Sequence, residues 1–200
     1  MTPDPRRLEI DAALFAGMMS QLAHRGGGSR ESGAFLLTTT ASEPAAADGA
    51  WQLVTAIAYY DDLDPGSLTG DITFTADGYT ALAAICRRNG LKIAADIHTH
   101  PGRWVRQSQT DETHPMVALP GHIALIAPRY AQGLIEIRDL GAHHYHGDGQ
   151  WTSSYGNDVA SILRLTEKQA RPARAADPLR HAAVLFHRSR RLLITRKPRP

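Results

Sequence analysis

Three side chains able to bind a metal lie close together near the middle of the sequence. His98 and His100 are two residues apart at the end of a short apolar segment, Leu91 to His98. Side chains two apart in a strand leave the same face, so both imidazoles are predicted to point at one ion. Asp111 follows eleven residues after His100 and supplies a carboxylate. Three protein ligands leave one position of a zinc ion open, which is typical of a catalytic zinc site.

Two further polar residues are candidates for the chemistry at such a site. A zinc ion lowers the pKa of a bound water from ~15.7 to about 7, and that water then needs a proton acceptor. Glu31 follows a glycine-rich stretch and precedes a predicted strand, so it is the candidate general base and later general acid. Ser108, three residues before Asp111, is the candidate hydrogen-bond donor to the oxyanion.

Taken singly, each of these residues has a plainer interpretation. Glu31 alone is a surface carboxylate, and a lone His-x-His is often a pair of satisfied histidines at a strand end. Ser108 and Asp111 also fit a capping box at the start of a short helix. Their joint occurrence at fixed spacing favours the functional interpretation.

The combined pattern resembles the JAMM signature of the JAB/MPN family. The sequence contains Glu31, then His98-Thr99-His100-Pro101, then seven residues counted from Pro101, Ser108, two more residues and Asp111. Family members with the complete motif are zinc metallopeptidases, deubiquitinase-like isopeptidases that remove or trim ubiquitin-like proteins. The resemblance implies one zinc ion per chain bound by His98, His100 and Asp111, with Glu31 and Ser108 as the catalytic residues.

The same resemblance carries expectations about fold, substrate and partners. It implies an α/β protein of three α/β/α layers with a mixed central sheet, similar to the cytidine deaminases. The expected substrate is a ubiquitin-like protein or its conjugate, hydrolysed after the C-terminal glycine in deconjugation or precursor processing. Activating or conjugating enzymes of the same system are expected partners. The small size resembles prokaryotic members of the family.

Charge divides the chain into an acidic body and a basic tail. Residues 1–156 carry 11 Lys+Arg against 17 Asp+Glu, whereas residues 157–200 carry 11 against 3. We expect a metallopeptidase domain over residues 1–156 and a basic extension over 157–200 that contains a helix and a weak hairpin pattern. The alternative function is a non-catalytic or DNA-associated metal-binding module that uses this tail.

Several other classes of protein are disfavoured by what the sequence lacks. Cys86 is the single cysteine, whereas the fold-related deaminases need a cysteine-containing zinc site. No His-Glu-x-x-His motif occurs, which excludes metalloproteases that bind zinc through this motif on a helix. No apolar run is long enough to cross a membrane and no signal peptide is recognisable, so we expect a cytoplasmic protein without a membrane partner.

Hydrophobic periodicity predicts the elements that position the candidate residues. Helices are expected at Leu8–His24, ended by Gly26 to Gly28, at Thr75–Asn89, ended by Gly90, and around Val159–Thr166. Strands are expected at Ala34–Thr39, Leu53–Tyr60, Leu91–His98, His122–Pro128 and Leu134–Asp139, with a hairpin over His143–Trp151.

Neighbours of the motif allow further predictions. Asp96 lies on the same strand face as the two histidines, either as acceptor for a ligand imidazole or paired elsewhere. Trp104 is predicted to pack the loop between the ligands, with contact to substrate as the alternative. His143, His144 and His146 are predicted to alternate in a solvent-facing hairpin without a metal.

Overall fold

The computed structural model describes residues 6–40, 51–70 and 72–167. The chain divides into a unit of residues Met1–Gln169 and a second unit of residues Ala170–Pro200. The second unit lies outside the described residues, and so does the hairpin expected there. The following description therefore concerns the first unit alone.

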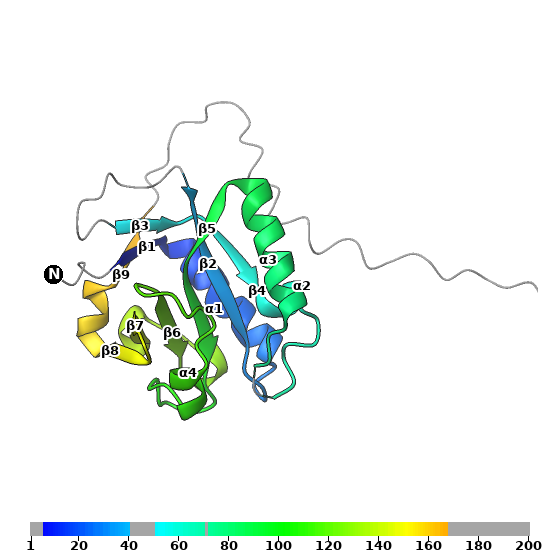
Figure 1. The fold of residues 1–200 in the computed structure, drawn as a ribbon. Helices are drawn as coiled ribbons and strands as arrows, with labels where there is room; N and C mark the ends of the chain where they lie inside the picture. The colour runs from blue at the N-terminus through cyan, green and yellow to red at the C-terminus, as the bar shows by residue number, and fades with distance from the viewer. Residues whose placement is uncertain (1–5, 41–50, 71, 168–200) are drawn as a thin grey trace, which may run out of the picture. The chain divides into compact units, whose positions relative to one another are not determined.

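A six-stranded mixed sheet is the centre of this unit (Figure 1). Its strands, in spatial order, are β4 (Ala56–Tyr59), β2 (Gly33–Thr39), β5 (Leu91–Thr99), β6 (Ile123–Ala127), β7 (Gly141–Gly147) and β8 (Gln150–Tyr155). Strands β5 and β6 run parallel and the other neighbours antiparallel, which confirms the predicted mixed sheet.

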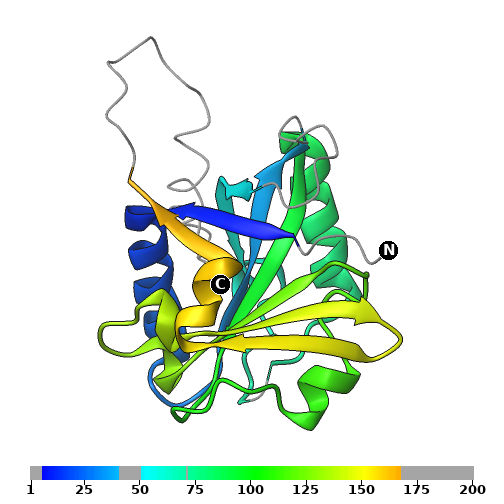
Figure 2. The same ribbon diagram turned by 90° about the vertical axis from the view of Figure 1, so that its left-hand side faces the viewer.

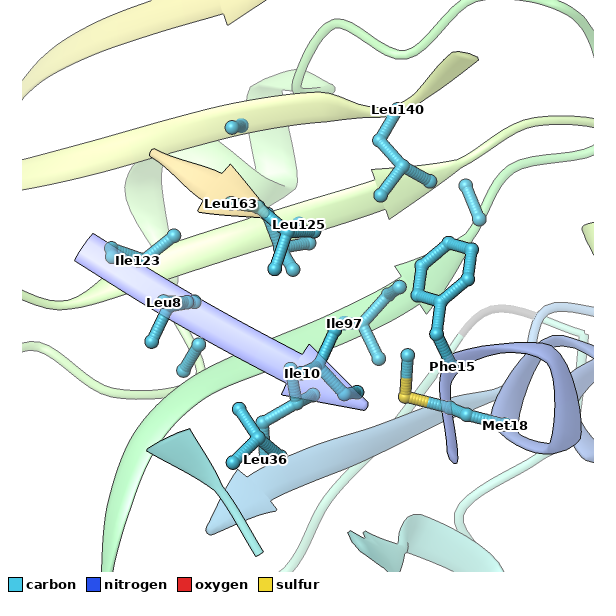
Figure 3. Packing of buried hydrophobic residues seen from close by; sticks show 14 of the residues in the cluster. Leu8, Ile10, Phe15, Met18, Leu36, Ile97, Ile123, Leu125, Leu140 and Leu163 are labelled. Carbon is cyan, nitrogen blue, oxygen red and sulfur yellow. The ribbon is translucent and has the colours of Figure 1, made fainter. Parts of the chain in front are cut away.

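Helices α1 (Ala12–Gly26) and α3 (Ala76–Asn89) pack against opposite faces of this sheet. Phe15 and Met18 of α1 pack with Ile97 and other residues of the first face, as Figure 3 shows. Leu82 of α3 packs on the second face. Because side chains alternate along β5, Ile97 faces α1 while its neighbour His98 faces the side of α3. The candidate metal ligands therefore lie on the α3 side of the sheet.

A second, three-stranded parallel sheet has the order β3 (Trp51–Val54), β1 (Arg7–Asp11) and β9 (Leu163–Thr166) (Figure 2). The helix predicted to start at Leu8 starts instead at Ala12, because Leu8 and Ile10 alternate in β1 and are fully buried. Asp11 then caps the helix by accepting hydrogen bonds from the N–H groups of its second and third residues.

Two other predicted elements are wrong. The segment Val159–Thr166 is not a helix: the 3₁₀ helix η4 (Gly156–Ser161) ends there, and β9 follows because it pairs with β1. Residues Leu134–Asp139 form no strand, and the 3₁₀ helix η3 (Ile137–Asp139) is fixed by a capping box between Glu136 and Asp139. Local periodicity did not reveal these pairings.

The single strand predicted at Leu53–Tyr60 is also wrong, because the chain breaks at Thr55 into two strands: β3 pairs with β1 in the three-stranded sheet and β4 pairs with β2 in the six-stranded sheet. The other predicted elements are present. They are the strand at Ala34–Thr39, the helix ended by Gly90, the strand before the His-x-His pair, the strand after His122 and the β7–β8 hairpin. The short elements α2 (Tyr60–Leu63), α4 (Gln109–Thr113) and η2 (Arg129–Ala131) complete the unit. Among the described residues, no helix is long and apolar enough to cross a membrane.

Candidate metal centre

The three predicted ligands meet at the carboxyl end of β5. The Nε2 atoms of His98 and His100 are 3.1 Å apart. The Asp111 carboxylate lies 3.4 Å from His98 Nε2 through Oδ1 and 3.3 Å from His100 Nε2 through Oδ2. Within the described parts of the chain, this is the one group of His, Cys, Asp or Glu side chains close enough to bind a common ion.

These separations fit a tetrahedral metal site. Ligand atoms at 2.0–2.1 Å from a tetrahedral zinc ion are about 3.3 Å from one another. The measured 3.1, 3.3 and 3.4 Å are close to that value. Nδ1 of His100 lies 3.2 Å from the carbonyl oxygen of Trp104, so Nδ1 carries the proton and Nε2 keeps a lone pair. The side chains present therefore suit a divalent ion with one open position.

Local electrostatics also favour a cation between the ligands. Burial alone would raise the pKa of Asp111, but hydrogen bonds to His100 and His98 outweigh it and hold that pKa well below its usual value. Burial alone would lower the pKa of His98, but the carboxylates of Asp111, Asp96 and Glu31 raise it. The Asp111 carboxylate is thus ionised, and negative charge accumulates around one buried and one partly buried imidazole.

Pairing of β2 with β5 brings Glu31 next to the ligands. Gly33 is opposite His98 in the sheet. Ser32 donates its N–H to Thr99 Oγ1 at 3.0 Å, and Thr99 donates its N–H to the Ser32 carbonyl at 2.9 Å. Glu31 precedes this pair, and its charge acts on His98. The pairing thus brings the segment of Glu31, which is half-buried, to the end of β5 that carries the predicted ligands, more than sixty residues further along the chain.

Ser108 is the N-cap of α4, as its capping-box pattern predicts. Its Oγ accepts a hydrogen bond from the Asp111 N–H at 3.2 Å, and its own N–H donates to Asp111 Oδ2 at 2.7 Å. The capping box thus fixes the orientation of a ligand carboxylate. A hydroxyl that accepts a bond keeps its own proton to donate, so the predicted oxyanion role stays open to Ser108.

Comparison with known proteins gives a distant likeness to a metalloprotease. No protein-family model matches the chain. The probable metalloprotease y4jG of Sinorhizobium fredii is 24% identical over 79 residues, which are 40% of this chain and 48% of that protein. The chain thus spans about half the length of this curated relative.

Solved structures show that the fold occurs elsewhere. Protein DSY2949 of Desulfitobacterium hafniense superposes with a TM-score of 0.53 at 17% identity, over 82% of this chain and 97% of that one. A protein from Salinibacter ruber gives 0.51 at 19% identity, over 84% and 96%. AF2198, a JAB1/MPN domain protein of Archaeoglobus fulgidus, gives 0.36 at 13% identity, over 74% and 94%, and this looser overlap supports no inference.

Among the described residues, the hydrogen bonds of Asp96 go to side chains other than the candidate ligand imidazoles. It is almost fully buried and accepts hydrogen bonds from His122 Nε2 at 2.5 Å and from the Tyr60 hydroxyl at 3.1 Å. Sequence patterns gave no sign of Tyr60 or His122, because their approach depends on α2 and β6 meeting beside β5. This group lies on the sheet face that carries His98.

Two predictions about neighbouring side chains are wrong. His143 and His144 do not face solvent: both are buried, and only His146 of the three is exposed. Trp104 does not pack the loop down, because 74% of its surface is exposed. His143 performs that task instead, through a hydrogen bond to Val105.

Proposed function

We propose that the protein is a zinc-dependent peptidase of the JAMM type, hydrolysing the bond after the C-terminal glycine of a ubiquitin-like protein. The observation that carries this proposal is the spacing of 3.1–3.4 Å between His98, His100 and Asp111, with Glu31 close enough to raise the pKa of His98. A purely structural zinc site closes its fourth position with protein and has no use for a neighbouring carboxylate.

The roles of the side chains follow from their chemistry. A zinc ion bound here supplies Lewis-acid polarisation of the scissile carbonyl and lowers the pKa of a coordinated water. Glu31 accepts the proton of the attacking water and then donates it to the departing amine, so one carboxylate serves both halves of the reaction. Ser108 donates its hydroxyl proton to the oxyanion as negative charge develops there.

The proposed fold assignment is a JAB/MPN domain with three α/β/α layers, similar to the cytidine deaminases. Its support is the packing of α1 and α3 on opposite faces of one mixed sheet. The proposed substrate tail binds in an extended conformation and adds a strand by backbone hydrogen bonds. Exposed Trp104, whose carbonyl oxygen holds His100, offers that tail an apolar contact.

The proposal extends to the protein's setting. Deconjugation or precursor processing would take place in the cytoplasm, beside the activating or conjugating enzymes of the same system. A gene neighbourhood with such an enzyme supports deconjugation, and one with sulfur-transfer enzymes supports trimming of a precursor.

A cleavage assay tests the proposal. The zinc-loaded protein is incubated with a ubiquitin-like fusion that ends in Gly-Gly before either a peptide or a lysine-linked amine, and products are read by mass. We expect cleavage after the second glycine that chelator abolishes and zinc restores. Glu31→Gln should retain zinc but lose at least ~100-fold in rate. Glu9→Gln, which alters a partly buried carboxylate paired with Arg164 on the second sheet, is the matched control and should cleave at the wild-type rate.

The outcome of this assay also distinguishes the peptidase from the alternative function, a DNA-associated metal-binding module. Full activity of Glu31→Gln removes this residue from the mechanism. Absence of cleavage, together with DNA binding that weakens steeply with salt, favours the DNA-associated module instead. The basic composition of residues 157–200 is the feature that supports this alternative.

A further inference from the structure

Three consecutive residues after β6 have left-handed backbone conformations. The φ angles are 54° at Arg129, 52° at Tyr130 and 58° at Ala131, and none of the three is glycine. In this region Cβ approaches the following carbonyl oxygen too closely, so L-residues seldom adopt it and runs of them are rarer still. Backbone strain of this kind persists only where surrounding contacts impose it, and it is concentrated at functional sites.

This left-handed turn, Arg129–Ala131, holds the backbone of one candidate ligand. Tyr130 donates its N–H to the carbonyl oxygen of His100 at 2.8 Å, and Arg129 donates its N–H to the carbonyl of Gly102 at 2.7 Å. The His100 N–H in turn donates to the Ala127 carbonyl at 2.9 Å. Both backbone groups of His100 are therefore fixed by β6 and the turn that follows it.

Contacts on its other side explain why the turn keeps this shape. Hydrogen bonds of 2.9 Å from Ala131 to Pro128 and from Gln132 to Arg129 close it. Ala131 is 2% exposed and belongs to the core that α1 covers. The Gln132 amide lies over Gly28, where an added Cβ would clash with it. Gly28 belongs to the segment between α1 and Glu31, so the residue that follows the turn lies beside the segment that leads to Glu31.

We propose that the left-handed turn Arg129–Ala131 is a positioning element of the metal centre. By holding the backbone of His100, it sets the imidazole so that Nε2 stands 3.1 Å from His98 Nε2 and 3.3 Å from Asp111. The inference rests on the metal site of the proposed function and does not depend on the substrate. Tyr130, Arg129 and Ala131 act through His100 and contact no ion themselves.

Two substitutions at position 130 isolate the backbone effect. Tyr130→Val and Tyr130→Asn both remove the phenol ring, but valine disfavours the left-handed region while asparagine tolerates it. We expect Tyr130→Val to bind Zn²⁺ at least ~10-fold more weakly, the usual scale for losing a support of a metal ligand. Tyr130→Asn should bind as the wild type does. The visible spectrum of the Co²⁺-loaded protein should change in the valine variant alone.

A merely structural role of the turn would give a different result. It would lower the stability of the metal-free and metal-loaded protein equally, so the affinity and the Co²⁺ spectrum of a folded Tyr130→Val variant would stay unchanged. Equal loss in both variants would assign the effect to the ring. Either result overturns the proposal.

The wild-type protein provides a measurement that needs no variant. If the turn holds His100 in its ligating position, Zn²⁺ should slow hydrogen exchange of the Tyr130 and Arg129 amides by ~10-fold or more, whereas the Leu82 amide in α3 changes less. Unchanged exchange of the two turn amides on metal binding contradicts the proposal even if Tyr130→Val does not fold. Absence of metal binding by the wild type would instead defeat the metal centre itself.

Discussion

His143 donates a hydrogen bond from Nε2 to the carbonyl oxygen of Val105 at 2.9 Å, while its Nδ1 accepts one from the Ser153 hydroxyl at 2.8 Å. The bond joins β7 to the loop between His100 and Ser108. Gly141 makes the approach possible, because a Cβ there would clash with the same carbonyl. The loop between the candidate ligands is thus fixed near its end by β7, as it is at its start by the left-handed turn.

This arrangement predicts a loss of stability in mild acid. Burial lowers the pKa of His143 from 6.5 to about 4. In the unfolded chain the imidazole takes up a proton near pH 6.5, so unfolding gains a proton between about 6.5 and 4 and stability falls as pH falls through that window. Over the whole window, this difference in proton uptake lowers the free energy of unfolding by at most about 3 kcal/mol.

Urea unfolding of the metal-free protein at pH 7.5 and pH 5 checks this. His143→Gln keeps an N–H donor for Val105 but does not titrate, so its stability should fall less between the two pH values. His146→Gln, at an exposed position of the same strand, should fall as the wild type does. Identical losses in all three proteins would show that His143 is not the group responsible.

The buried pair of Asp96 and His122 predicts a large effect on folding. Removing His122 leaves the buried carboxyl group of Asp96 without this hydrogen bond, and an unsatisfied buried polar group costs about 1–3 kcal/mol. His122→Ala should therefore lower the free energy of unfolding by that amount in urea titrations. His24→Ala, which changes an exposed histidine of α1, should change it by less than about 0.5 kcal/mol. A small effect at position 122 would contradict a stabilising role of this buried hydrogen bond.

Two glycine substitutions should have opposite effects. In Gly33→Ala the new Cβ meets the ring of Tyr60 and the carbonyl oxygen of Ile97, so we expect strong destabilisation and displacement of the neighbouring Glu31. Gly17→Ala meets nothing within 4 Å on the exposed side of α1 and should stabilise the protein by about 0.5–1 kcal/mol. Thermal unfolding of both variants gives the comparison, and a stable Gly33→Ala protein would contradict the close packing of Tyr60 on β2.

The clustering of His98, His100 and Asp111 was predictable because its signals are short-range in sequence. His98 and His100 share a strand end, and Ser108 and Asp111 share one helical turn, so spacing alone places each pair. Glu31 was assigned from its place before a predicted strand and from the resemblance, and the position of its segment beside His98 depends on the pairing of β2 with β5.

Long-range contacts decided the features that the sequence did not reveal. Leu8 and Ile10 fit a helix as well as a strand until β3 and β9 pair with them. The same pairing turns Leu163–Thr166 into a strand. His143 looked like a surface histidine because its burial requires the loop of Val105 to cover it. Three left-handed residues without glycine carry no local sequence signal at all.

Anomalous diffraction at the zinc absorption edge, from crystals of the wild-type protein grown with Zn²⁺, tests the central claim most directly. We predict one strong peak per chain, within bonding distance of His98 Nε2, His100 Nε2 and the Asp111 carboxylate, and no peak there in Asp111→Ala crystals. A zinc-loaded protein with no peak between these three side chains, or with its peak elsewhere, would contradict the account.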